Sequence, residues 1–185
     1  MKLLENKAIC LVLMVCLIAA GTWIGGYKSL NGLHRQAEDV FFTGERGDGI
    51  CIANDLSERA AAAANLVTIA GNYAGLSEEA QAVSAASAEL TSALGRNRID
   101  ALADANRKLD TAMTALYSGL GEHQLTQQHE KYRQSLYADF NSRGDTISHD
   151  PYNTYAQAYN DALEAFPAGL LASITPAPSS AVIFY

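Results

Sequence analysis

The chain has 185 residues, a formal net charge of −7 and 49% hydrophobic residues. That acidic balance argues against nucleic acid and anionic lipid headgroups as partners, because both repel negative charge. The length is enough for one domain with a hydrophobic core. Cys10 and Cys16 lie in an apolar segment, which leaves Cys51 as the only cysteine of the body. One thiol cannot crosslink a domain to itself, so Cys51 is interpreted as a passive, lightly buried cysteine.

The most informative segment runs from Ala8 to Gly26, which are nineteen consecutive positions without a charged side chain. At about 1.5 Å of rise per helical residue, these positions are long enough to cross the roughly 30 Å hydrocarbon core of a bilayer. Trp23 and Tyr27 follow at the level where interfacial aromatic residues anchor a span. The segment therefore predicts a retained, single-pass transmembrane helix that contacts the lipid bilayer.

Two alternatives for this segment stay open. A signal peptide would use Lys2 and Lys7 as its basic region and would be cleaved after the small residues near Gly21. Lipid attachment at Cys16 is less favoured, because the bulky Val15 precedes it. Retention is preferred over cleavage, since the apolar run continues past the cleavage position.

The charged flanks favour a cytoplasmic amino terminus and an extracytoplasmic body at the cell membrane. Lys2 and Lys7 precede the span, and the acidic body follows it. Gly21 and Gly25 form one Gly-x-x-x-Gly spacing, which lets two membrane helices approach closely. A weak homo-oligomer is accordingly among the expected partners, beside the bilayer and an unidentified protein.

After the span, apolar residues recur at spacings of three and four, which is the helical period. A first helix continues out of the membrane segment and ends at the glycine-rich stretch 44–49. The pattern next predicts one long, kinked helix over residues 54–94 and another over 99–121. No stretch alternates with a period of two, so strands are not expected.

A further helix is predicted to begin near Thr126 and to stop before Asp150-Pro151. Proline is tolerated in the first turn of a helix but not in its interior, so Asp150 is interpreted as the N-cap of a new segment. This segment presents one face of aromatic residues, which we call the predicted seam: Tyr152, Tyr159 and Phe166.

These elements predict an all-α protein, an up-and-down antiparallel four-helix bundle of coiled-coil-like heptads preceded by one N-terminal transmembrane helix. The predicted organisation is an anchor over residues 1–26, a helical bundle over 27–170, and a Pro/Ser-rich tail with an apolar end over 171–185.

The seam contains a seven-residue repeat, Tyr152-Asn153 and Tyr159-Asn160. Residues seven apart lie two turns along one helix face, so the rings form a seam and the asparagines flank it. Asn153 and Asn160 are therefore candidate interaction residues. Two readings remain: their amides bind a partner, or they satisfy backbone groups and tyrosine hydroxyls at the edge of the bundle. The second reading is favoured.

The repeat, with Phe166-Pro167 and Leu170 after it, resembles the LemA family. Three other groups of residues are similar to that family in order along the chain. They are Tyr27, Leu30, Leu33, Glu38, Asp39 and Phe41; Asn65-Leu66-Val67 with Tyr73-Ala74; and Leu102, Ala105 and Leu109. The resemblance implies a membrane-anchored four-helix bundle without an established catalytic activity. The chain departs from it in a longer glycine-rich stretch, in Phe41 where tryptophan is usual, and in Pro151.

Catalytic and metal-binding motifs are not found in the sequence. The four histidines occupy different elements, and no His-Glu-x-x-His, Cys-x-x-Cys or Glu-x-x-His spacing occurs. Asp145 and His149 are four apart and are interpreted as turn and cap residues rather than as a cation site. His129 lies on an apolar face and is interpreted as a hydrogen-bonded histidine. The predictions are thus no catalytic residue, no metal and no cofactor.

The carboxyl-terminal residues form the last candidate interaction site. A Pro/Ser-rich stretch precedes Ala181 and Val182, and the run ends in Ile183, Phe184 and Tyr185. Two readings compete. The tail folds back beside Phe166 and Leu170, or another protein captures it by strand addition. Fold-back is favoured, because burying two such side chains would stabilise the fold by roughly 1.5 to 3 kcal/mol each.

The sequence as a whole favours a membrane-anchored interaction or scaffolding module. The alternatives are an extracytoplasmic sensor of a small molecule or peptide and, less favoured, a hydrolase. A sensor would require a cavity with convergent polar groups, whereas a scaffold would show a filled core and an outer groove.

Overall fold

The computed structural model describes residues 7–165, 169 and 180–184, and these are helical apart from turns, loops and the tail. Contacts divide the chain into two units. The first contains α1 up to Glu38 together with Thr154–Ala181, and the second contains Asp39–Asn153 together with Val182–Tyr185. Each unit is described by itself.

The first unit is built on α1 (Lys7–Thr43), whose early part is long and apolar enough to cross a membrane. The large apolar side chains of this part are exposed, with Leu17 at 73% and Trp23 at 42%. Within the unit, α6 (Tyr152–Glu164) contacts α1 where the Tyr159 ring meets His34 edge-on, with ring centroids 5.0 Å apart. The apolar part of α1 thus lacks the burial that such side chains have in a soluble core.

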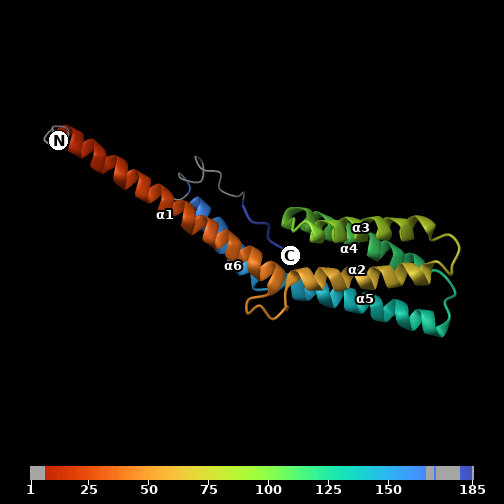
Figure 1. The fold of residues 1–185 in the computed structure, drawn as a ribbon. Coiled ribbons are helices and arrows are strands. Elements are labelled where there is room, and N and C mark those ends of the chain that lie inside the picture. The colour runs from red at the N-terminus through yellow and green to blue at the C-terminus, as the bar shows by residue number, and fades with distance from the viewer. Residues whose placement is uncertain (1–6, 166–168, 170–179, 185) are drawn as a thin grey trace. The chain divides into compact units, whose positions relative to one another are not determined.

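The second unit packs four helices side by side: α2 (Ile52–Ala70), α3 (Ser77–Gly95), α4 (Ile99–Gly121) and α5 (Gln127–Ser148) (Figure 1). Helix α2 contacts the other three, and α4 also contacts α3 and α5. The core consists of one side of each helix, in agreement with the helical period of the apolar residues. Its fully buried large side chains include Leu56, Leu66, Leu90, Leu102, Leu109, Met113, Leu116 and Phe140.

The predicted single helix over residues 54–94 is wrong. The structure has two helices, α2 and α3, which pack against each other. The chain reverses at residues 71–76, where Gly75 adopts φ +90°, a conformation that other residues rarely adopt. A helical period continues through such a turn in the sequence, because both helices need an apolar face. Periodicity alone therefore does not reveal the reversal.

Several predicted helix boundaries are confirmed. Helix α1 ends at Thr43, before Gly44, whose added Cβ would lie 2.5 Å from the Ile50 carbonyl oxygen. Helix α5 begins after Thr126, whose hydroxyl accepts a hydrogen bond from the His129 N–H at 3.2 Å. The Asp150 carboxylate accepts one from the Tyr152 N–H at 2.8 Å, as expected of an N-cap. These boundaries follow from local chemistry, which explains why the sequence reveals them.

Cys51 is buried, and its thiol donates to the Phe42 carbonyl at 3.4 Å. It lies at the N-cap position of α2, at the end of the glycine-rich loop. Cys51 is 1% exposed, so it is buried more deeply than the light burial that the sequence predicted.

Candidate functional site

The candidate site lies in the second unit, where the tail meets the first turn of α6. We call it the tail site and define it by Phe41, Tyr152, Asn153 and the tail residues 182–184. The Asn153 Nδ2 donates to the Phe184 carbonyl at 2.7 Å, and its Oδ1 accepts from the Phe184 N–H at 2.9 Å. The Tyr152 hydroxyl donates to the Val182 carbonyl at 2.7 Å. Three polar contacts of the site are therefore made to the main chain of the tail.

The Phe184 ring supplies the apolar part of the tail site. It is 3% exposed and packs against Phe41, with ring centroids 5.2 Å apart, and against Tyr152 at 6.1 Å. Phe41 and Tyr152 contact each other edge-on at 5.0 Å. Aromatic rings in these tilted and edge-on arrangements attract each other beyond their buried area. The three rings therefore form one aromatic cluster that covers the start of α6.

Asn153 is itself held in place by the end of α5. Its Nδ2 also lies 3.2 Å from the Ser148 carbonyl and 3.5 Å from that of Ile147. These carbonyls belong to the last turn of a helix, where no intrahelical N–H is available to them. The Asn153 amide is therefore positioned by the fold rather than by the tail alone.

Asn160 makes the same pair of contacts in the first unit. Its Nδ2 donates to the Ala181 carbonyl at 3.0 Å, and its Oδ1 accepts from the Ala181 N–H at 2.7 Å. We call this pair the Asn160 contact. Both asparagines of the seven-residue repeat thus bond one tail residue each through its N–H and its C=O, in agreement with the prediction that they satisfy backbone groups.

The predicted seam is described in part. Tyr152 and Tyr159 are 1% and 0% exposed, and burial raises the pKa of the Tyr159 hydroxyl. Phe166, Leu170 and Tyr185 lie outside the described residues, so the expected packing of the tail beside the first two cannot be located. Ile183 is half-buried. The described tail residues of the second unit contact Phe41 and the first turn of α6.

A buried polar cluster in the second unit was not predicted. Arg59 of α2 is 2% exposed and bonds Asn106 and Asp110 of α4. Its Nε donates to the Phe140 carbonyl at 3.2 Å, and its guanidinium carbon lies 3.9 Å from the centre of the Phe140 ring. The neighbouring Asp55 accepts from Arg143 at 2.9 Å. Asp55 and Arg59 are buried, and each is paired with a residue at the surface, since the side chains of Asp110 and Arg143 are 47% and 40% exposed. This pairing indicates a structural role.

A signal for the cluster exists in the sequence. Asp55 and Arg59 are four apart in the apolar pattern of α2, one helical turn from each other. Charged residues at such spacing usually form a solvated pair, and their burial depends on the acidic and aromatic partners that α4 and α5 bring from far along the chain. The spacing therefore suggests an ion pair between Asp55 and Arg59, whereas in the structure Asp55 bonds Arg143 and Arg59 bonds Asp110.

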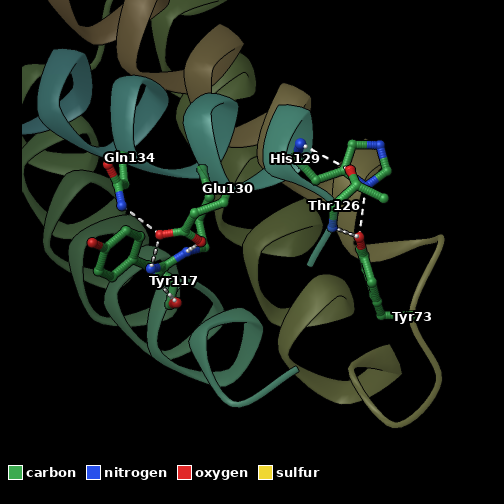
Figure 2. A network of polar contacts seen from close by, with 7 residues as sticks. Tyr73, Tyr117, Thr126, His129, Glu130 and Gln134 are labelled. Carbon is green, nitrogen blue, oxygen red and sulfur yellow. Dashed lines mark hydrogen bonds and ion pairs between the residues drawn. The ribbon is translucent and has the colours of Figure 1, made fainter. Parts of the chain in front are cut away.

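A second polar network closes the end of the second unit that holds the turn of residues 71–76 (Figure 2). The Tyr73 hydroxyl lies 2.7 Å from the His129 Nδ1 and accepts from the Thr126 N–H at 3.4 Å. The His123 ring lies 5.8 Å from that of Tyr73. His129 is hydrogen-bonded, as predicted. The network ties the α2–α3 turn to the start of α5.

Beside it, Arg133 joins α4 to α5. It forms an ion pair with Glu130 at 2.8 Å and donates to the Tyr117 carbonyl at 2.9 Å. The Arg133 hydrogen bonds hold the pKa of Glu130 below its usual value. In Figure 2, the side chains of Glu130 and Gln134 lie beside that of Tyr117. Glu130 and Arg133 are paired with each other, so neither of them is available as a free base or acid.

Among the described residues, no group of three or more histidine, cysteine or acidic side chains is arranged to hold a metal ion. Asp145 and His149 are exposed and 3.7 Å apart at the end of α5, where the His149 Nδ1 also lies 2.9 Å from the Asp145 carbonyl.

A surface cleft of about 550 Å³ between α3 and α4 is lined mainly by alanines, with Glu89, Arg96 and Arg98 at its edge. Glu89 is paired with Lys108, and Arg98 with Asp100.

Comparison with protein families, with curated proteins and with solved structures finds no match for this chain. The geometry of the tail site and the exposure of α1 therefore carry the functional argument.

Proposed function

We propose that this protein is a single-pass membrane protein whose helical body is an interaction or scaffolding module, similar to the LemA family in design. The observation that carries the proposal is the contrast within α1. Its early part is apolar and exposed around its whole circumference, which is the pattern of a helix in lipid. A soluble protein that exposed this surface would be prone to aggregate.

The proposal places an up-and-down antiparallel four-helix bundle, formed by α2 to α5, outside the membrane. Short connections at 71–76, 96–98 and 122–126 support this topology, because such loops make sequential helices neighbours. The basic residues before the span support a cytoplasmic amino terminus. The proposed function of the helical body is to bind a partner rather than to catalyse a reaction. It is supported by the paired polar groups of the second unit and by the hydrogen bonds that Tyr152 and Asn153 make to the main chain of the tail.

The membrane part of the proposal is tested by extracting membranes with alkaline carbonate. The full chain should stay in the membrane pellet, and a variant without residues 8–26 should be released. Substituting Leu17→Arg should weaken insertion, because an arginine near the centre of a span costs about 2.5 to 3.5 kcal/mol. Recovery of a processed, soluble product that begins near Thr22 would show a cleaved signal peptide instead.

The orientation is tested separately. Protease added to intact spheroplasts should degrade the body, whereas an inward-facing body would be protected until the cells are lysed.

A further inference from the structure

The tail site recognises the main chain of an extended segment. The Asn153 amide donates to the C=O and accepts from the N–H of the same residue, Phe184. Every residue except proline presents both groups, so this pair of hydrogen bonds is independent of the side chain. The Tyr152 hydroxyl adds a third main-chain bond, to Val182. The hydrogen bonds of the tail site therefore require an extended backbone. They do not select any side chain, and they exclude only proline at the position of Phe184.

Side-chain preference comes from the aromatic cluster. Phe184 is the one described tail residue that is fully buried, while Ala181, Val182 and Ile183 are half-buried. Its neighbours Phe41 and Tyr152 offer ring faces and edges rather than charges. An aromatic residue at this position and apolar residues before it match the site best.

We propose that the tail site is a binding site for an extended segment of a partner protein, with apolar residues followed by an aromatic residue. The proposal rests on the proposed interaction function and names its partner class. The chain's own tail occupies the site and keeps it closed. Because an attached segment competes at an effective concentration in the millimolar range, a partner binds only when it outcompetes or displaces the tail.

Displacement of the tail leaves the core of the second unit intact. The large buried side chains of α2 to α5 pack on one another, and the described tail contributes Phe184 alone to the buried set. The tail is thus an exchangeable occupant of the site.

The test uses the full chain in detergent and a variant that ends at Ser179. The probe is a fluorescent peptide, Ser-Ala-Val-Ile-Phe-Tyr, followed by fluorescence anisotropy. The shortened chain should bind the probe saturably, and the full chain should bind it at least about tenfold more weakly because its own tail competes. A full-length Phe184→Asp variant, which expels the tail by burying a charge, should also bind the probe.

Two changes separate main-chain recognition from apolar adhesion. Methylating the N–H of the probe's phenylalanine removes one hydrogen-bond donor, and should weaken binding about two- to tenfold. In the shortened chain, Tyr152→Phe removes the hydroxyl that donates to the Val182 carbonyl and should weaken binding by a similar factor. The matched control is Tyr132→Phe, a change at an exposed tyrosine of α5, and it should leave binding unchanged.

Four outcomes would overturn the proposal. The methylated and unmethylated probes bind equally, which would show apolar adhesion. The full chain binds as tightly as the shortened one, which would show that the tail does not compete. The full chain dimerises through its tail, which would make a second copy the occupant. The shortened and Phe184→Asp chains keep their helical circular dichroism and membrane retention but bind no probe, which would leave the proposed membrane function standing and reject the tail site.

Discussion

The early part of α1 and helix α4 both contain many apolar residues, yet they present them in opposite ways. Leu17 of α1 is 73% exposed, whereas Leu109 of α4 is fully buried. In α4 the apolar residues follow one face, and polar residues cover the other. In α1 the apolar residues surround the helix. The comparison teaches that the period of the apolar residues, rather than their number, indicates whether a helix faces protein or lipid.

The largest expected effect comes from making one substitution in both regions. Leu109→Ala should lower the free energy of unfolding of the body by about 2 to 5 kcal/mol, because it leaves a cavity in the core. Leu17→Ala should change it by no more than about 0.5 kcal/mol, as expected of a position without core contacts. Chemical denaturation of both variants in the same detergent measures the difference. Equal effects would contradict the division between a lipid-facing and a core-forming helix.

Removal of the buried Phe184 ring from the tail should have the next largest effect on stability. Phe184→Ala should lower the free energy of unfolding by about 1.5 to 3 kcal/mol, the value for burying a large apolar side chain. The half-buried Ile183 serves as the control, and Ile183→Ala should cost less. The melting temperature reports both variants. An unchanged melting temperature for Phe184→Ala would show that the tail adds nothing to the body.

A smaller effect is expected at the opposite end of the second unit. Tyr73→Phe removes the hydroxyl that contacts His129 and Thr126, and should lower the free energy of unfolding by about 0.5 to 1.5 kcal/mol. Tyr132→Phe is the control, because Tyr132 is an exposed residue of the same helix as His129. Hydrogen exchange at the start of α5 should become faster in Tyr73→Phe alone. Equal exchange in the two variants would disprove the tie between the α2–α3 turn and α5.

The smallest effect is a pH dependence at Asp150. Burial raises the pKa of its carboxyl group above the ordinary value, and the charges of Asp55 and Glu45 add to the rise. The folded chain therefore binds this proton more tightly than the unfolded chain. Stability consequently falls as the pH rises from the ordinary pKa through the raised one.

Asp150→Asn should remove that slope while its amide oxygen still accepts from the Tyr152 N–H. The stability of the variant relative to the parent should thus increase with pH across this window, as measured by denaturation at a series of pH values. Parallel curves would exclude a contribution from Asp150.

Much of the fold follows from local sequence signals. The helical period, the glycines after Thr43, and the caps at Thr126 and Asp150 act within a few residues, so their consequences can be predicted without a partner segment. The seven-residue repeat also drew attention to Asn153 and Asn160, whose role as interaction residues stays a prediction. The resemblance to the LemA family rests on residues of this kind and stays a prediction, as do the domain boundaries at residues 26 and 170.

Contacts between distant residues required the tertiary structure. Asn153 bonds Phe184 thirty-one positions away, and Arg59 bonds Phe140 eighty-one positions away. The sequence showed two asparagines, an apolar tail and a charged pair, but each had several chemically acceptable partners. Only the packing of the helices selects among those partners, because burial depends on which faces meet. The sequence by itself therefore determined the helical class and the apolar segment long enough to cross a membrane, whereas the tertiary structure decided the reversal between α2 and α3, the buried arginine and the occupant of the tail site.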